Sequence, residues 1–247
     1  MRVITWPLRA LDFLLPMQCA LCQQYSDTRH PLCSWCKASF SSSHKYCPKC
    51  GEPNPVSYRG FCPDCPPIPF TFDRCRIAWE YSDGLRHLIH QWKFEQAFQF
   101  TATLADLVTE ALPDSPKIDA LIPMPLHWRR FWQRGYNQCE LLANTVGRAT
   151  GVPMVRGLKR INYRSPQHQA RSKRQRALSA EDFSCRHDVK DLRLALIDDV
   201  MTTGNTANAA ASCLKQAGAR SVELWCIART RKPRTTEQQN NRTTEQL

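Results

Sequence analysis

The stretch of sequence that decides the fold reads Leu194-Ala195-Leu196-Ile197-Asp198-Asp199-Val200-Met201-Thr202-Thr203-Gly204-Asn205-Thr206. Its apolar beginning predicts a buried strand over residues 192–197, which ends at two adjacent carboxylates, Asp198 and Asp199. Threonines and Gly204 then form a turn, and small apolar residues on one face predict a helix over residues 205–217. A strand, an acidic pair, a turn and a helix in this order predict a binding site at the carboxyl end of the strand.

Each part of this stretch suits one part of a sugar phosphate. The two carboxylates can accept hydrogen bonds from a ribose diol or help position a hydrated Mg²⁺. Gly204 allows close backbone approach, and the N–H groups that open the helix at Asn205 can hold a phosphate with help from the helix dipole. No second glycine and no Gly-Lys-Ser/Thr motif occurs in the turn, which excludes dinucleotide and Walker loops. A strand–turn–helix without a ligand is the alternative.

Strands and helices alternate through much of the chain around this stretch. The expected strands lie at 77–79, 118–123 and 221–228, and the expected helices at 85–94, 102–111 and 139–150. This alternation predicts an α/β fold in which helices flank a parallel, doubly wound sheet.

The 247 residues divide by composition into four segments. Residues 1–18 are expected to form an amphipathic segment packed on the protein, and residues 19–70 a small cysteine-rich module. Residues 71–230 are expected to form the α/β domain. Residues 231–247 are polar, contain the sequence Arg-Thr-Thr-Glu-Gln twice, and are expected to be a disordered tail.

Four Cys-x-x-Cys pairs fill the cysteine-rich module. They are Cys19 and Cys22, Cys33 and Cys36, Cys47 and Cys50, and Cys62 and Cys65. Because an x-x spacing lets two thiolates converge on one ion, the pairs predict two tetrahedral, structural Zn²⁺ sites. Disulfides are the alternative, and His30 or His44 could replace a thiolate. The spacing does not decide whether the pairs combine sequentially or crosswise.

The zinc module has little apolar area to bury, so bound metal should supply most of its free energy of folding. It could be purely structural, or it could also bind nucleic acid or a partner protein. The five isolated cysteines are expected to be small buried apolar residues. They are Cys75, Cys139, Cys185, Cys213 and Cys226.

The chain is strongly basic. Its 34 lysines and arginines exceed its 22 acidic residues by 12, which favours polyanionic ligands such as nucleic acid, nucleotides or a diphosphate. The excess is concentrated in residues 128–187, the basic belt, with thirteen lysines and arginines and three acids.

Targeting signals are weak. Residues 3–17 are apolar enough to suggest a signal peptide, but Arg9 and Asp12 interrupt them and no small-residue cleavage site follows. No stretch approaches the roughly 18 apolar residues that a membrane span needs. We therefore expect a cytoplasmic protein without a membrane span.

Three further motifs complete a pattern with the cysteine pairs and residues 194–206. They are Trp92-Lys93-Phe94, Pro123-Met124-Pro125-Leu126-His127-Trp128-Arg129-Arg130 and Arg134-Gly135-Tyr136-Asn137-Gln138. In this order, over residues 19–229, the motifs resemble the ComF/GntX family, which is linked to competence and DNA utilisation. Residues 194–206 themselves resemble the phosphoribosyl-diphosphate (PRPP) signature of type I phosphoribosyltransferases. The resemblance implies a phosphoribosyltransferase-like domain preceded by a double zinc ribbon.

The resemblance also implies roles for single residues. Asp198 and Asp199 would hold the ribose 2′ and 3′ hydroxyls as the catalytic pair, with Mg²⁺ accompanying PRPP. The 5′-phosphate would be wrapped by Met201, Thr202, Thr203, Gly204, Asn205 and Thr206. The diphosphate would contact Arg129, Arg130 and Arg134, for which a solvated arginine cluster is the alternative.

Residues 160–176 resemble the family's mobile segment, with matches at Arg160, Gln167 and Arg174. Ala177 stands where many relatives are expected to have asparagine, which puts one hydrogen bond and turnover in doubt. A basic mobile segment also suits single-stranded DNA. Aromatic side chains that could stack on bases, or could instead belong to the core, are Trp128, Phe131, Trp132 and Tyr136.

These features support three hypotheses about function. The first is a ComF-like protein that binds PRPP or a nucleotide 5′-phosphate together with single-stranded DNA and supports DNA uptake or utilisation, with a helicase or another DNA-processing protein as a candidate partner. The second is an active phosphoribosyltransferase that transfers ribose 5-phosphate to an unidentified acceptor. The third is a non-catalytic zinc-ribbon adaptor. Similarity of fold does not separate them.

Overall fold

The computed structural model describes residues 17–28, 30–40, 46–52, 62, 65–162 and 178–230. The expected segment at 1–18, except its last two residues, and the expected tail at 231–247 lie outside the described residues. Four other positions with predicted roles also lie outside the described residues. They are His44, Ala177, and Gln167 and Arg174 of the expected mobile segment.

Four strands form one parallel sheet in the order β1-β6-β5-β2. They are β1 (Arg74–Glu80), β2 (Ala120–Pro123), β5 (Arg193–Met201) and β6 (Ser221–Arg229). All four expected strands are confirmed. β5 lies between β6 and β2, so its carboxyl end opens at the same edge of the sheet as theirs.

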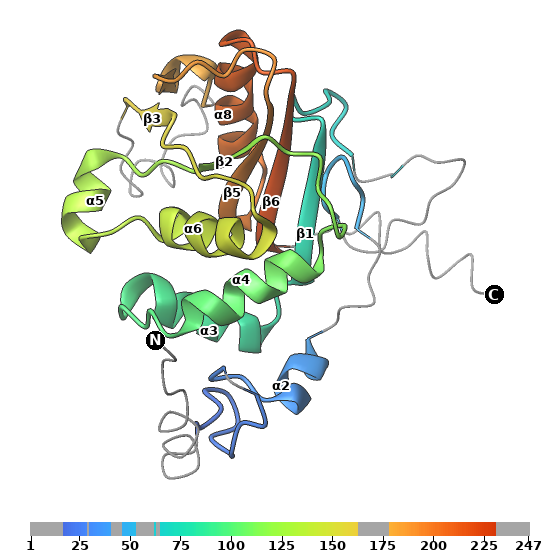
Figure 1. Ribbon diagram of the computed structural model, residues 1–247, viewed down its shortest axis with the longest axis vertical. Helices are drawn as coiled ribbons and strands as arrows, with labels where there is room; N and C mark the ends of the chain where they lie inside the picture. Colours follow the sequence, from blue (N-terminus) through green and yellow to red (C-terminus); the bar gives the residue numbers. More distant parts are fainter. Residues whose placement is uncertain are drawn as a thin grey trace, which may run out of the picture.

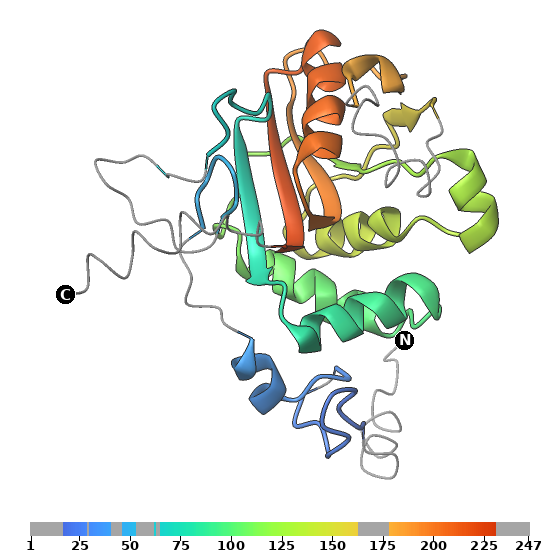
Figure 2. The ribbon, with the colours of Figure 1, turned by 180° about the vertical axis from the view of Figure 1, so that it is seen from behind.

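Helices cover both faces of this sheet (Figures 1 and 2). One face carries α3 (Asp83–Phe94), α4 (Phe100–Glu110) and α6 (Gln138–Thr150), and the other carries α8 (Asn205–Gln216). Alternating β5 residues enter the two cores, since Ile197 packs toward the first group and Leu196 toward α8. The predicted doubly wound α/β fold is therefore confirmed. Among the helices described, none is both long enough and apolar enough to cross a bilayer.

The structure corrects one prediction and adds elements that were not predicted. β5 does not end before the acidic pair, because pairing with β6 continues through Asp198 to Met201. Aspartate is unfavourable in strands, but pairing inside a central strand overrides that preference here. The added elements are α2 (Ser34–Ser39), α5 (Trp128–Arg134), β3 (Leu158–Arg160), η1 (Ala180–Asp182) and β4 (Phe183–Cys185).

The cysteine-rich segment packs on the α/β core at two places. Residues 17–28 and 30–40 lie against α3 and α4 (Figure 1). There, His30 pairs with Asp106 at 2.8 Å. Residues 46–52 lie along β1. There, a buried ion pair forms between Glu52 and Arg229, the last residue of β6, with Oε1 2.7 and 3.0 Å from two guanidinium nitrogens.

Glu52→Gln should lower the free energy of unfolding by about 3 kcal/mol, because it leaves the Arg229 guanidinium charged and unpaired inside the protein. Urea denaturation of the zinc-loaded protein measures the change. Glu110→Gln is the matched control, since it breaks the more exposed pair between Glu110 and Lys37 and should cost less than about 1 kcal/mol. Equal effects of the two substitutions would contradict the assignment of a stabilising role to the buried pair.

Candidate functional site

The acidic pair lies at the carboxyl end of the central strand. Asp199 is buried, and its Oδ2 accepts hydrogen bonds from Lys93 Nζ at 2.8 Å and Gln138 Nε2 at 2.9 Å. Asp198 Oδ1 accepts from the backbone N–H of Asp199 at 2.9 Å and lies 3.7 Å from Cys139 Sγ. Strand β5 and helices α3 and α6 therefore converge on the two carboxylates.

A tyrosine and an asparagine hold these helices in place. Tyr136 Oη donates to the carbonyls of Trp92 and Lys93 at 2.6 and 3.1 Å. Asn137 caps α6 by accepting from the Cys139 N–H, and its Nδ2 donates to the Met124 carbonyl at 3.1 Å. The motifs at 92–94, 123–130 and 134–138 are thus joined around one site.

Burial and charge set the protonation of this cluster. Burial raises the pKa of Asp198 to about 7, the charge of Asp199 adds to the increase, and Lys93 opposes it. Although Asp198 is partly exposed as a residue, its carboxyl group is enclosed by protein. Burial alone would lower the pKa of Lys93, but its contact with Asp199 raises it above the ordinary value. Near neutral pH, Asp198 can therefore offer both a hydrogen-bond donor and an acceptor, while Lys93 stays charged.

Residues 201–206, which carry the predicted phosphate contacts and are called the phosphate turn for that reason, run from the end of β5 into the first turn of α8. Gly204 has a φ of 80°, and a Cβ atom there would lie 2.6 Å from Met201 Cε and 2.8 Å from the Phe70 ring. Glycine is required on both grounds. The Met201 side chain is buried, so only its backbone can face a ligand. Within the described part of the chain, the N–H groups of Thr203 and Thr206 donate to no protein oxygen, as expected at a helix start that can bind an anion.

The three predicted diphosphate arginines lie on α5. Arg130 and Arg134 line a cavity of about 500 Å³, whereas the Arg129 guanidinium stacks on Trp128 at 5.2 Å. The Arg134 guanidinium lies 4.7 Å from the centre of the Phe94 ring. No acidic side chain is among the described residues that line the cavity, which are Lys93, Phe94, Gln96, Arg130, Gln133, Arg134 and Tyr136. Lys93 links the cavity to Asp199.

The eight paired cysteines form two clusters that combine the pairs sequentially. The first cluster is Cys19, Cys22, Cys33 and Cys36, and the second is Cys47, Cys50, Cys62 and Cys65. Sulfur atoms within the clusters lie 3.7 to 3.8 Å apart, close to the edge of roughly 3.8 Å that a tetrahedron with Zn–S bonds of about 2.3 Å has. All eight thiols are free of disulfides. The clusters therefore fit two structural zinc ions, and the pairing that spacing left open is sequential.

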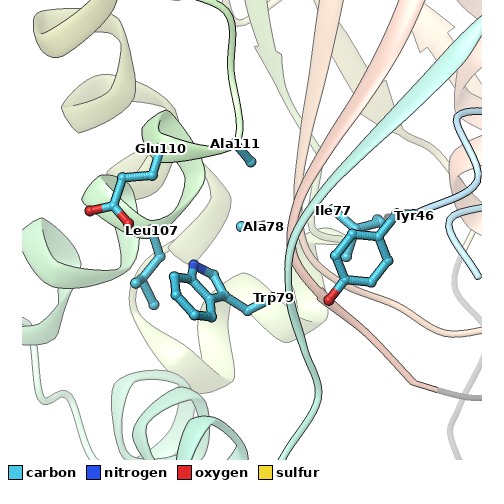
Figure 3. A pocket seen from close by; sticks show the side chains of 7 residues that line it. All are labelled: Tyr46, Ile77, Ala78, Trp79, Leu107, Glu110 and Ala111. Carbon is cyan, nitrogen blue, oxygen red and sulfur yellow. The ribbon is translucent and has the colours of Figure 1, made fainter. Parts of the chain in front are cut away.

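A separate cavity of about 370 Å³ lies at the outer edge of β1. In Figure 3, Trp79 points toward Leu107 of α4, while Tyr46 lies near Ile77 on the other side of the strand. The cavity is lined by Tyr46, Ile77, Ala78, Trp79, Leu107, Glu110 and Ala111, all of them outside the acidic pair, the phosphate turn and α5. It is therefore distinct from the candidate site.

Comparison with known proteins identifies both parts of the chain. A double zinc ribbon domain matches residues 10–66, and a phosphoribosyl transferase domain matches residues 137–245. Competence protein F of Haemophilus influenzae is 31% identical over 211 residues, which cover 81% of this chain and 91% of that protein. The chain belongs to the ComF family.

Two further relatives carry related names. DNA utilization protein YhgH of Salmonella typhi is 29% identical over 226 residues, covering 87% of this chain and 98% of that protein. Competence protein ComFC of Bacillus subtilis is 28% identical over 239 residues, covering 92% of this chain and 90% of that protein. The resemblance inferred from the motifs is confirmed, and the family unites competence and DNA-utilization proteins with a phosphoribosyltransferase-like domain.

Three residues of the site received no role from the sequence. Lys93 and Gln138 lie inside the motifs at 92–94 and 134–138, which marked them without indicating that both reach Asp199. Cys139 was expected to be a small buried residue; it is buried, but it also contacts Asp198. A buried lysine with a specific charged partner is a signal of function that only the fold reveals.

The stability of the ligand-free protein should fall as the pH rises from about 4 to about 7. Over this range native Asp198 keeps its proton, whereas the unfolded chain loses it near the ordinary value of 3.8, so the native state binds more protons. Above the folded pKa of about 7 this contribution is lost. Asp198→Asn should remove it, and Asp114→Asn, at an exposed position, should not. Urea denaturation at several pH values measures both, and a pH-independent difference between wild type and Asp198→Asn would contradict the assigned pKa.

Proposed function

We propose that the site binds PRPP. Asp198 and Asp199 would hold the ribose hydroxyls, and the N–H groups of the phosphate turn would hold the 5′-phosphate. The observation that carries the proposal is the continuity of an acidic pair, a glycine turn with unpaired N–H groups and a helix start, all at the carboxyl end of β5. This is where ligands bind in doubly wound sheets.

The cavity beside α5 suits the diphosphate of the same ligand. Lys93, Arg130 and Arg134 supply positive charge there, and Arg134 is held against the Phe94 ring. Guanidinium groups match phosphate oxygens in charge and geometry. Mg²⁺ that arrives with PRPP would neutralise part of the diphosphate charge. Lys93 would then connect the ribose and diphosphate ends of the site.

We further propose that the exposed side of α5 binds single-stranded DNA and that the protein supports uptake or utilisation of DNA. Trp132 is 80% exposed, Trp128 and Phe131 are also exposed, and Arg129 lies over Trp128. Aromatic and arginine side chains on one helix form a stacking and phosphate-binding surface. Tyr136 has a structural role and not a stacking role, because its hydroxyl donates to backbone carbonyls.

A helicase or other DNA-processing protein would act on the same strand. None of the thirteen cysteines forms a disulfide, which fits a reducing, cytoplasmic location.

An active phosphoribosyltransferase is the second candidate. The cavity of about 500 Å³, which Lys93 connects to Asp199, could hold the diphosphate that the transfer releases, and the acidic pair could stabilise a ribosyl centre that develops positive charge. This candidate requires diphosphate release from PRPP in the presence of an acceptor, and loss of that release in Asp199→Asn. A non-catalytic zinc-ribbon adaptor, by contrast, would show no stabilisation by PRPP.

PRPP with Mg²⁺ should raise the melting temperature of the zinc-loaded protein by about 5 °C or more at saturation, because a ligand bound to the native state stabilises it. The Asp198→Asn/Asp199→Asn double variant should lose the shift, and Asp114→Asn should keep it. Thermal unfolding followed by circular dichroism measures all three. No shift in the wild-type protein would refute the proposed ligand, and an equal shift in the double variant would refute the proposed site.

Reversing the charge of Arg129, Arg130 and Arg134 to glutamate should weaken binding of a fluorescent single-stranded oligonucleotide by tenfold or more. Loss of three phosphate contacts should also reduce the slope of log affinity against log salt by about 2. The matched control reverses three exposed cations outside the basic belt, Arg86, Lys117 and Arg220, which changes the net charge equally. Equal weakening in both variants would show that total charge, and not α5, controls binding.

A further inference from the structure

The segment that leaves the second cysteine cluster runs directly to the phosphate turn. Five residues after Cys65, the Phe70 ring lies 2.8 and 3.0 Å from the position that a Cβ atom of Gly204 would take. The ring therefore fills the space beside the glycine at the start of α8. A residue of the cysteine-rich module thus forms one wall of the turn.

This segment is fastened to α8 by hydrogen bonds. The Thr71 N–H donates to Asn208 Oδ1 at 2.6 Å, and Ser212 Oγ lies 2.9 Å from Thr71 Oγ1. The ring of Phe70 also stacks on Phe72, which is buried, at 4.7 Å. The Phe70 ring is consequently held between Phe72 and Gly204, so it cannot easily move away from the phosphate turn.

A second route joins the same cluster to the other end of the turn. Glu52 closes the turn that carries Cys47 and Cys50, since its carbonyl accepts a hydrogen bond from the Cys47 N–H at 3.0 Å. Its carboxylate holds Arg229, which lies beside Met201 in the β5–β6 register. The next residue along the chain, Thr230, donates its N–H to the Met201 carbonyl at 3.0 Å. The second cluster therefore reaches both Met201 and Gly204.

The segment of the first cluster packs mainly against the helices on one face of the sheet. It contacts α3 and α4, through Phe40 against Gly84 and through ion pairs to Asp106 and Glu110. The Phe40 ring also lies edge-on to Trp79, near the end of β1, with 6.0 Å between the ring centres. Among the described residues, none of these contacts involves residues 201–206, Arg229 or Thr230. The two clusters have the same ligands, but among the described residues only the segment of the second cluster contacts the phosphate turn.

We infer that the second zinc ribbon positions the phosphate turn, with Phe70 as a positioning residue and the Glu52–Arg229 pair as a second support. The inference takes its functional meaning from the proposed phosphate site. Because coupling between two sites is reciprocal, a change in the turn must also disturb the second ribbon. The first ribbon should remain unaffected. Simple core packing of Phe70 would not produce this selective response.

Hydrogen exchange of the full-length, zinc-loaded protein tests the inference without any ligand. Phe70→Ala should speed exchange at least threefold in residues 201–208. Ile68→Ala, in the same segment but 83% exposed, should leave exchange there unchanged. Gly204→Ala, which forces Phe70 aside, should speed exchange in residues 46–52 and 65–73 but not in residues 17–40. It should also speed release of one of the two zinc equivalents to a chelator.

The outcomes separate this inference from the proposed function. Unchanged exchange in residues 201–208 in Phe70→Ala, or equal acceleration in both ribbons in Gly204→Ala, would overturn the positioning role even if wild type binds PRPP. Selective coupling in a protein that shows no PRPP shift would support the positioning role and refute PRPP as the ligand. If both hold, Phe70→Ala should weaken PRPP binding about tenfold while Ile68→Ala matches wild type. Phe70→Leu, which keeps apolar volume, should restore much of the affinity.

Discussion

Two adjacent carboxylates at the end of a buried central strand impose the constraint on which the site depends. β5 pairs with β6 as far as Met201, so Asp198 and Asp199 cannot move apart into solvent. Two carboxylates held together in a low-dielectric setting resist double ionisation, which contributes to the raised pKa of Asp198, and the charge of Asp199 needs compensation. Lys93 from α3 and Gln138 from α6 supply it at Asp199. The packing of both helices on one face of the sheet is therefore part of the site.

The small cysteine-rich module contacts the same end of the sheet. A small metal-stabilised ribbon has few apolar contacts of its own, so its shape depends on its cysteine cluster. The second cluster sends Glu52 to the end of β6 and Phe70 to the start of α8, at either side of the phosphate turn. The second cysteine cluster and the phosphate turn therefore share contacts through Glu52 and Phe70. This gives a physical reason for the two domains to occur together.

Much of the fold followed from local patterns. The apolar periodicity of α3, α4, α6 and α8 and the continuous apolar runs of the strands are strong signals. α5 was missed because Trp128–Arg134 has no apolar stripe, and its ends depend on a cap from His127 and a left-handed Gly135. β3 and β4 were missed because each has three residues and gains its stability from the other. The end of β5 was misplaced because pairing with β6 overrides the weak strand preference of aspartate.

For the site, the sequence by itself determined the acidic pair, the glycine turn, the eight cysteine ligands and the arginines, since each belongs to a short motif whose spacing carries its chemistry. Only the tertiary structure decided that Lys93 and Gln138 meet at Asp199, that the clusters combine sequential cysteine pairs, and that Phe70 closes the turn at Gly204. These contacts join residues from 11 to 134 positions apart. Side-chain spacing reports only neighbours along one strand or helix, whereas packing of separate elements brings such residues together.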